Sequence, residues 1–313
     1  MIPVFRAGDV ERAVSPHEAY DAVRQAFEAH ARGSWSMPSK VYVSNYPAGD
    51  FRAMPAIGGG HALLKWVTSF PGNPARGLPT VIGLVLLSDA EDGRLLAVLE
   101  AAAVTALRTA AAGVLAADTL CRPEASSYAV IGCGVNGAET ARMLLAHGIT
   151  PLVWDVDETR RDAVADRLGA RVATTADEAL RSEVVVTVTP GAEVLYPDGS
   201  LQAGQHVSLM GADGPGKAEV AVTELQRAHL FFDDWEQAGS KGIGEVGQGA
   251  AARIIRREDV TELGQVLIGE ADGRRSAGDI TLFDSSGLAI QDLAIAKVAY
   301  ARRDELDLQT IEL

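Results

Sequence analysis

The stretch Val130-Ile131-Gly132-Cys133-Gly134-Val135-Asn136-Gly137 decides the fold. It follows a β-rich run at 128–131 and opens a helical pattern at 138–146. In this setting the glycines match G-x-G-x-x-G, where they permit a tight turn, close approach of a pyrophosphate and close packing of the helix on the strand. A glycine-rich turn in another kind of α/β protein is the alternative. The residues expected to contact a dinucleotide are Gly132, Gly134, Val135, Asn136 and Gly137.

An acidic residue ends the next predicted strand, 151–154, and supports the dinucleotide interpretation. This residue, Asp155, stands where a carboxylate accepts hydrogen bonds from both ribose hydroxyls. A 2′-phosphate would be repelled there, so the sequence predicts NAD as the cofactor. Arg160 and Arg161 follow closely and leave the use of NADP open.

The pattern of elements changes along the chain. Residues 128–232 alternate β-rich runs with helical patterns, which is typical of a parallel sheet with crossover helices. Before them come an amphipathic helix over 16–31, short β-rich runs between 41 and 87 that indicate an antiparallel sheet, and an apolar alanine-rich helix over 100–120. A last alanine-rich helix, 288–302, is placed to pack back onto this first part.

These patterns predict an α/β protein of two domains. We expect a doubly wound Rossmann domain that binds NAD over 121–289. The other domain is expected to be a discontinuous α+β domain for substrate binding and dimerisation, over 1–120 and completed by 290–313. A homodimer is expected because a small sheet needs cover on its outer face.

Charge and hydropathy narrow the partners. The formal charge of −14 over 313 residues would repel nucleic acid phosphates and anionic membranes, so a small molecule is the expected partner. The longest strongly apolar run found, 81–87, is shorter than the roughly 20 residues of a membrane helix. Residues 1–14 show no hydrophobic signal region, and the two cysteines suit a reducing cytoplasm. We expect a cytoplasmic protein without a metal, since the histidines show no paired ligand spacing.

Cations in the first part indicate a carboxylate substrate. Lys40, Arg52 and Lys65 are the candidates, with solvated surface residues as the alternative. The apolar neighbours of Lys65 argue against that alternative. Arg108 stands inside the apolar helix and therefore needs an anion. An internal acid would serve, but the neighbouring sequence supplies none, so a ligand carboxylate is favoured.

Seven ordered stretches span nearly the full length of the chain: Phe51-Arg-Ala-Met-Pro-Ala, Leu64-Lys-Trp-Val, Pro71-Gly-Asn-Pro with Gly77-Leu-Pro-Thr80, Thr105-Ala-Leu-Arg108-Thr109, Gly132-Cys-Gly-Val-Asn-Gly137, Gly211-Ala-Asp213-Gly-Pro-Gly-Lys217 and Thr281-Leu-Phe-Asp-Ser-Ser-Gly-Leu-Ala-Ile-Gln-Asp292. Together they resemble the ornithine cyclodeaminase and mu-crystallin family.

The resemblance implies roles for individual residues. Lys65 and Arg108 would hold the substrate carboxylate, Thr80 would lie by the cofactor and substrate, and Asp213 would handle protons. Thr109 is assigned to the cofactor site. Asp213 also follows a predicted strand, 207–210, where ligands of doubly wound folds bind, although a turn or helix-cap aspartate is the alternative.

The implied chemistry is hydride transfer at the α-carbon of a small amino or imino acid, with Asp213 as general base. Three activities remain open: ornithine cyclodeamination, which is a lyase reaction, amino acid dehydrogenation of the alanine type, and cyclic imine reduction. Arg52 would repel the side-chain ammonium of ornithine, whereas Glu100 could attract it. A non-catalytic NAD(P)-binding or storage protein of the mu-crystallin type is the other alternative, which need not keep Lys65, Arg108 and Asp213.

Overall fold

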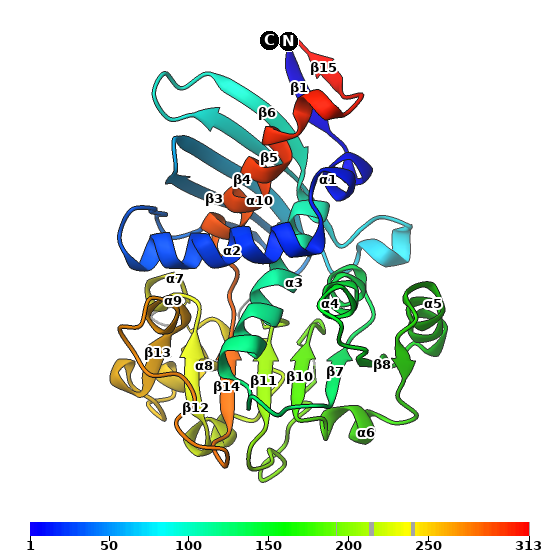
Figure 1. Cartoon of the computed structure of the whole chain (residues 1–313), viewed down its shortest axis with the longest axis vertical. Coiled ribbons are helices and arrows are strands. Elements are labelled where there is room, and N and C mark those ends of the chain that lie inside the picture. Colours follow the sequence, from blue (N-terminus) through cyan, green and yellow to red (C-terminus); the bar gives the residue numbers. More distant parts are fainter. Residues whose placement is uncertain (192, 213–215, 239–241, 313) are drawn as a thin grey trace. The chain divides into compact units, whose positions relative to one another are not determined.

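The computed structural model describes residues 1–191, 193–212, 216–238 and 242–312, which form two compact units (Figure 1). The first unit is Met1–Arg108 with Leu288–Leu313, and the second is Thr109–Gly287. The predicted division at 120/121 therefore falls too late, because the helix α3 (Ala101–Leu120) changes unit at its middle. Its second half belongs to the second unit, where the Ser208 hydroxyl donates to the Gly113 carbonyl at 3.0 Å.

The first unit is built on a seven-stranded sheet in the order β15-β1-β6-β5-β4-β3-β2. Its strands pair antiparallel except for β1 with β6. Their bounds are β1 Ile2–Phe5, β2 Val41–Asn45, β3 Gly49–Gly58, β4 His61–Ser69, β5 Val81–Asp89, β6 Leu95–Glu100 and β15 Gln309–Ile311. The predicted antiparallel runs are present, and β3 joins them.

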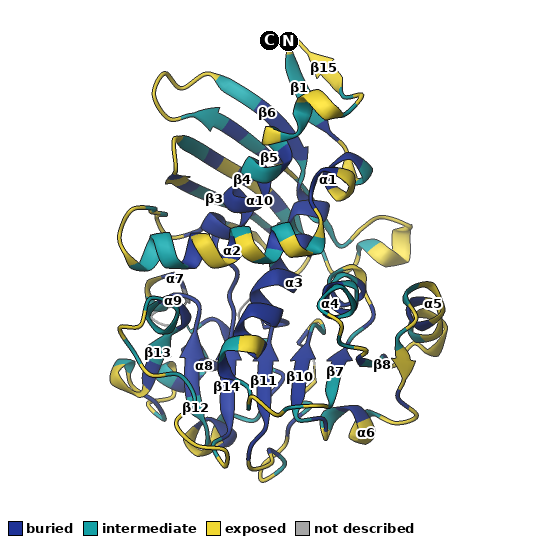
Figure 2. Ribbon diagram, viewed as in Figure 1, coloured by how far each residue is buried: buried dark blue, intermediate teal, exposed yellow. Residues whose placement is uncertain are grey.

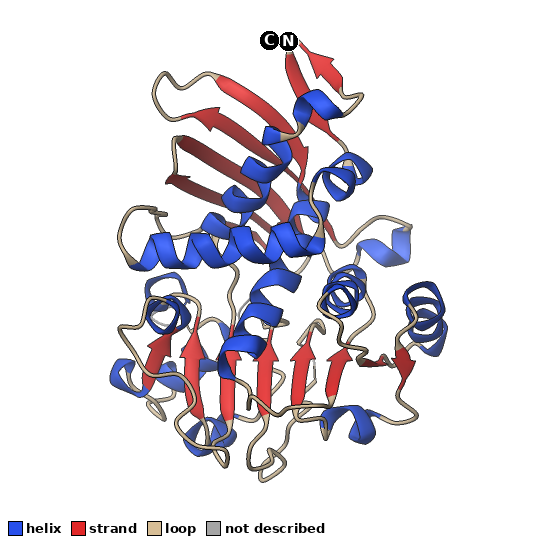
Figure 3. Cartoon of the chain, in the orientation of Figure 1, coloured by secondary structure: helices blue, strands red, loops and turns tan. Residues whose placement is uncertain are grey.

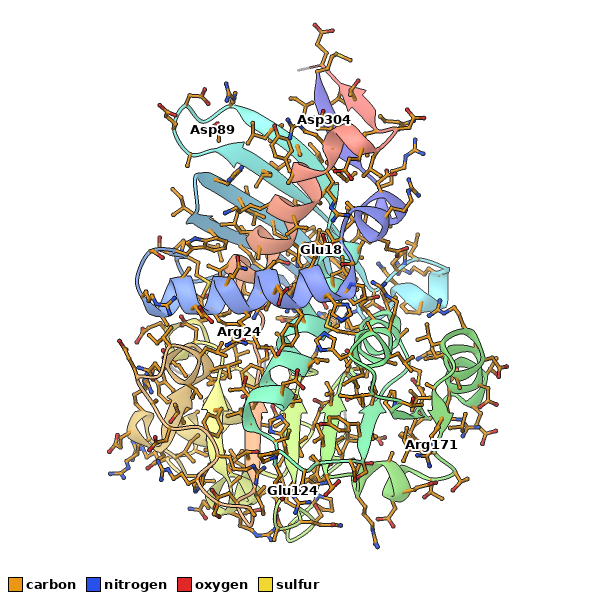
Figure 4. All side chains as sticks on the ribbon, viewed as in Figure 1. Glu18, Arg24, Asp89, Glu124, Arg171 and Asp304 are labelled. Carbon is orange, nitrogen blue, oxygen red and sulfur yellow. The ribbon has the colours of Figure 1, made fainter. Side chains whose placement is uncertain are left out.

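Helices cover one face of this sheet. α10 (Ala289–Ala301) packs against β3, β4 and β5 and against α2 (Pro16–Ala31), while α1 (Ala7–Ala13) contacts β6 (Figure 3). α2 has the predicted bounds, because Ser15 caps it together with Glu18. Its polar side carries Glu18 and Arg24 (Figure 4), and its buried stripe includes Val23 and Phe27. α10 therefore brings a segment from the end of the chain onto strands near its beginning.

Strand alternation decides which side chains of the sheet face the helices. On β4, Leu63, Lys65 and Val67 are buried, whereas Leu64 and Trp66 are exposed. The buried set shares its face with α10. The opposite face of the sheet leaves large apolar side chains exposed (Figure 2).

The second unit holds an eight-stranded parallel sheet in the order β13-β12-β14-β11-β10-β7-β8-β9. The strands are β7 Tyr128–Ile131, β8 Leu152–Trp154, β9 Arg171–Val172, β10 Val184–Thr187, β11 His206–Leu209, β12 His229–Phe232, β13 Val260–Glu262 and β14 Thr281–Asp284. The helices are α4 Val135–Ala146, α5 Glu158–Leu168, α6 Ala176–Leu180, α7 Trp235–Ala238, α8 Gly244–Ala251 and α9 Leu263–Leu267. The predicted doubly wound α/β fold is confirmed.

The order of this sheet reverses beside β7. The chain runs outward from β7 through β8 to β9, then returns to the other side of β7 with β10. In open α/β sheets, ligands bind beyond the carboxyl ends of the strands at such a reversal. The glycine stretch at 132–137 follows β7 directly and so stands at this point.

α3 is long and apolar enough, by length and composition alone, to cross a membrane. The fold buries 78% of its most apolar 18-residue stretch, so its composition is that of a core helix. The expectation that took 81–87 as the longest apolar run overlooked this helix. Glu100 caps it, because its carboxylate accepts from the backbone N–H of Ala102 at 2.8 Å and of Ala103 at 2.7 Å.

Candidate active site

Lys65 lies buried on β4 with only 1% of its surface exposed. Its Nζ donates to Asp292 Oδ1 on α10 at 2.8 Å and to Thr105 Oγ1 on α3 at 2.6 Å. Burial lowers the pKa of Lys65 to about 8, Asp292 opposes this fall, and Arg108 and Arg52 add to it. The lysine is therefore charged at neutral pH and titrates far below an exposed lysine.

Arg108 approaches the same carboxylate from α3. Its Nε lies 3.6 Å from Asp292 Oδ1, and its Nη1 contacts Gln291 Oε1 at 3.4 Å. Asp292 supplies Arg108 with an internal anion, so the argument that Arg108 needs a ligand because no internal acid is available does not hold. The sequence around Arg108 contained no acid, since this acid comes from the far end of the chain. Arg108 Nε still has no hydrogen-bond partner among the described residues.

Arg52 and Lys40 are buried as well, each with 8% exposure. Arg52 Nε donates to Asp50 Oδ1 at 2.7 Å, and the guanidinium lies over the Tyr42 ring at 5.4 Å. The alternative that Lys40, Arg52 and Lys65 are solvated surface residues is therefore wrong. Asp50 also compensates the charge of Arg52, which weakens its expected repulsion of a substrate ammonium.

Five side chains of the first unit form what we call the cation cluster: Arg52, Lys65, Arg108, Asp50 and Asp292. Three cations and two carboxylates leave one net positive charge in a buried place. A buried charge that lacks a full counter-charge is costly, and a bound carboxylate would supply what is missing. The cluster is thus complementary to one small anion.

Two other predicted residues of this part, Thr80 and Glu100, make contacts of their own. Thr80 is half-buried between η1 (Asn73–Arg76) and β5, and its carbonyl accepts from the Phe70 N–H at 2.8 Å. Glu100 is engaged as the cap of α3 rather than offered to a ligand. Asp213, the predicted proton acceptor, lies outside the described residues.

The glycine loop has the shape that a dinucleotide requires. Gly132 has a φ of +98°, and a Cβ there would lie 2.8 Å from the Val188 carbonyl oxygen. A Cβ on Gly137 would lie 1.7 Å from the Gly132 oxygen, so the helix packs closely on the strand. A Cβ on Gly134 would meet nothing within 4 Å, which leaves the space that a pyrophosphate needs. Gly134 is also the N-cap of α4, so the free N–H groups at Val135 and Asn136 begin the helix there.

Asp155 ties the end of β8 to this loop. Its Oδ2 accepts from the Cys133 N–H at 2.6 Å, and its Oδ1 accepts from the Asp157 N–H at 2.8 Å. Each oxygen keeps a lone pair for a ribose hydroxyl. Arg160 Nη1 lies 3.6 Å from Asp155 Oδ2, and the Arg160 side chain is half exposed. The arginine expected near a 2′-phosphate is therefore close to this carboxylate. Thr109 is buried at the start of the second unit.

The sequence did not reveal an acidic cluster in the second unit, formed by Glu219, Glu245 and Asp284. Glu219 accepts four hydrogen bonds at 2.6–3.1 Å, from the Thr187 and Thr189 hydroxyls and the Thr189 and Gly211 N–H groups. Burial raises the pKa of Glu245 to about 7 and that of Asp284 well above its usual range. Asp284 ends β14, and Glu219 and Glu245 follow glycine-rich segments, which is the one signal that could have pointed to them.

This cluster is not a metal centre. Among the residues that the structure describes, no group of three His, Cys, Asp or Glu side chains is placed to hold a metal ion. Glu219 instead links the ends of β10 and β11, because it accepts hydrogen bonds from four donors located there.

Comparisons with known proteins agree with this geometry. The alanine dehydrogenase of Archaeoglobus fulgidus is 41% identical over 305 residues, which cover 93% of this chain and 92% of that protein. A solved archaeal alanine dehydrogenase dimer with bound NAD matches with a TM-score of 0.92 at 39% identity, over 99% of both chains. The Thermococcus litoralis Delta(1)-pyrroline-2-carboxylate reductase in complex with NADH and L-proline also gives 0.92, at 26% identity, over 99% of this chain and 100% of that one.

These relatives are enzymes, and the two solved structures hold NAD or NADH. The predictions of an enzyme and of NAD as its cofactor are confirmed at this level, and the non-catalytic alternative finds no support among them. A model of the ornithine cyclodeaminase/mu-crystallin family matches residues 3–306, nearly the whole chain. This chain therefore belongs to the ornithine cyclodeaminase/mu-crystallin family.

Proposed function

We propose that this protein is an NAD-dependent amino acid dehydrogenase that acts on a small amino acid with an uncharged side chain, alanine being the best candidate. The observation that carries the proposal is the cation cluster, where the buried Lys65 and the half-buried Arg108 share one carboxylate and keep a net positive charge. The 41% identity with an alanine dehydrogenase supports it.

Lys65 and Arg108 bind the substrate carboxylate in this proposal. Arg108 offers a planar fork of donors, whereas Lys65 offers a point charge. Holding the carboxylate from two sides fixes the direction in which the α-hydrogen points, and alignment of this kind provides much of the rate enhancement in such reactions. We assign substrate binding and dimerisation to the first unit and cofactor binding to the second.

The residues of the glycine loop fit NAD. Gly132, Gly134 and Gly137 would accommodate the pyrophosphate at the start of α4, and Asp155 would accept from the ribose. When bound, NAD supplies the acceptor for the α-hydrogen of the amino acid as hydride. Asp213 is proposed, on the family resemblance alone, to accept the amine proton or to activate water for release of the keto acid.

The side-chain specificity follows from the acids near the cluster. A diamino acid such as ornithine would need an acid for its second ammonium group. Asp50 is bonded to Arg52, Asp292 to Lys65, and Glu100 to the start of α3. Each of these acids already pairs with a cation or caps a helix of the protein, which favours a side chain without charge.

The exposed face of the first sheet is proposed to bury itself against a second copy of the chain. Trp66 and Leu84 pair across β4 and β5 on this face and are 43% and 51% exposed. Val41, Val43, Ile57, Leu64 and Ile82 extend it. An apolar surface of this kind marks an interaction site, and a solved relative is described as a dimer. We also propose a cytoplasmic location, in keeping with two unbridged cysteines.

The dimer is tested by sedimentation of Trp66→Glu. We expect the wild type to sediment as a dimer and the variant as a monomer. Each subunit of a symmetric dimer would bury one unpaired carboxylate in the interface, so the cost is incurred twice. The matched control is Val172→Glu, an exposed apolar residue of the second unit, which should leave the mass unchanged. A monomeric wild type would overturn this part of the proposal.

The activity is tested by following NADH absorbance with purified protein, NAD and a panel of alanine, other amino acids, ornithine and cyclic imines. We expect NADH, ammonia and pyruvate in equal amounts from alanine. Proline and ammonia from ornithine without net NADH would establish a cyclodeaminase instead. Cofactor binding without turnover of any compound would establish a binding protein.

A further inference from the structure

The two carboxylate oxygens of Asp292 make unequal contacts. It is fully buried, in the first turn of α10. Its Oδ1 receives both cations, Lys65 at 2.8 Å and Arg108 at 3.6 Å. Its Oδ2 has no hydrogen-bond partner among the described residues. One oxygen therefore fixes where two cationic side chains meet.

The donors of both cations are only partly used. Lys65 donates two N–H bonds, to Asp292 and to Thr105. Thr105 acts there as an acceptor, because its own hydroxyl donates to the Ala101 carbonyl at 2.6 Å. An ammonium has three donors, so the charged form of Lys65 has one left for a ligand, whereas the neutral amine has none. The usefulness of Lys65 in binding an anion thus depends on its remaining charged.

The groups that face Lys65 have opposite effects on its charged form. Arg108 on α3 and Arg52 on β3 disfavour it, and Asp50 offsets Arg52. Burial disfavours it most. Asp292 on α10 is the group that opposes all three effects. Without Asp292, two cations would be buried side by side with no carboxylate between them.

We propose that Asp292 is a positioning residue of the substrate site, which keeps Lys65 charged and directs Lys65 and Arg108 toward one point where a carboxylate binds. This inference rests on the proposed function, in which that carboxylate belongs to the amino acid. Asp292 touches neither the substrate nor the cofactor and acts through the two cations. A role limited to anchoring α10 on β4 would require no effect on the charge of Lys65.

The test is ¹⁵N NMR of protein labelled at the lysine Nζ atoms. The chain has five lysines, Lys40, Lys65, Lys217, Lys241 and Lys297, so the spectrum is simple. The Lys65 signal is assigned by its loss in Lys65→Met. We expect Lys65 to titrate near pH 8 in the wild type. In Asp292→Asn the midpoint should fall by about 1 pH unit or more, because a contacting opposite charge is lost.

Two further variants test the proposal if Asp292→Asn does not fold. Arg108→Gln should raise the Lys65 midpoint, because Asp292 then serves Lys65 alone. Thr105→Val is the matched control, since it removes the 2.6 Å contact without removing a charge, and it should shift the midpoint less than the other two variants. A Lys65 midpoint unaffected by both Asp292→Asn and Arg108→Gln would overturn the proposal.

Binding of propionate, which cannot be oxidised because it has no amine, completes the test. In the wild type at pH 7.5, propionate should shift the Lys65 signal, and its Kd should rise about tenfold or more in Asp292→Asn. Absence of any shift in the wild type would overturn the proposal. Because neither readout needs turnover, a shift by propionate in a protein that oxidises no amino acid would reject the proposed function while keeping the role of Asp292.

Discussion

Lys65 and Arg108 in the first unit lie beside the opposite charge of Asp292, whereas Glu219, Glu245 and Asp284 in the second unit are buried beside one another. In the cation cluster, unlike charges pair and one positive charge is left over. In the acidic cluster, hydrogen-bond donors satisfy Glu219, and burial raises the pKa values of Glu245 and Asp284.

The two clusters differ in the kind of group that meets each buried charge. A buried charge without full compensation is held at a cost, which a ligand of opposite charge would relieve. A buried acid with a raised pKa lowers this cost when it binds a proton. Burial and perturbed pKa values alone do not mark the substrate site. The donors that Lys65 and Arg108 have left for an anion do.

The largest effect is expected from Arg108→Gln. Loss of one partner of a buried charge pair lowers affinity by several kcal/mol, so kcat/KM for the amino acid should fall by about 100- to 1,000-fold. NAD affinity should not change, because the residues that would hold it lie in the other unit. The measurement is steady-state kinetics with NAD binding by calorimetry. Arg94→Gln, an exposed ion-paired arginine, serves as the control, and equal losses in both variants would count against the comparison.

The next effect is on stability, through Glu219→Gln. The amide replaces one acceptor oxygen by an NH₂ group, which faces donors from the threonines or from Gly211. The free energy of unfolding should fall by about 2–3 kcal/mol. Urea titration measures this, with the exposed Glu178→Gln as control. An unchanged unfolding free energy would mean that the acidic cluster is not closed by its internal donors.

A smaller effect concerns Glu245→Gln and pH. Burial, with the negative charge of Glu219 second, raises the pKa of Glu245 from 4.5 to about 7 in the folded chain. The stability that this group provides is therefore complete below pH 4.5 and is lost as pH rises to about 7, by on the order of 1–3 kcal/mol. Glu245→Gln cannot ionise, so its unfolding free energy should decline less over this window. Parallel declines in urea titrations of the two proteins would contradict the assignment.

The smallest effect is the pH dependence of the wild type itself. The pKa of Lys65 is lowered to about 8, so the positive charge that binds a carboxylate disappears as pH rises through that value. Above it, the affinity for propionate should fall by up to about tenfold for each pH unit. Affinity that stays constant from pH 7 to pH 9 would show that Lys65 does not contribute its charge to binding.

Local patterns predicted much of this molecule. The glycine loop at 132–137 was found because its signal lies within a few residues, and Lys65 stood out because its apolar neighbours imply a buried strand. The parallel sheet followed from alternating elements. Each of these inferences needs only sequence neighbours.

Contacts between distant segments were beyond reach. Asp292 meets Lys65 and Arg108 only because α10 returns to cover the first sheet, and a search near Arg108 found no acid. The acidic cluster likewise joins turns that follow different strands, so its pairing depends on strand order. The domain boundary was misplaced because α3 looks uniform in sequence yet divides its packing between two units.

The most direct test of the central claim is a crystal structure of the protein with NADH and propionate. The account predicts that the propionate carboxylate lies within hydrogen-bond distance of both Lys65 Nζ and the Arg108 guanidinium, with Asp292 still bonded to Lys65. A propionate bound elsewhere, with Lys65 and Arg108 contacting only protein atoms, would contradict it.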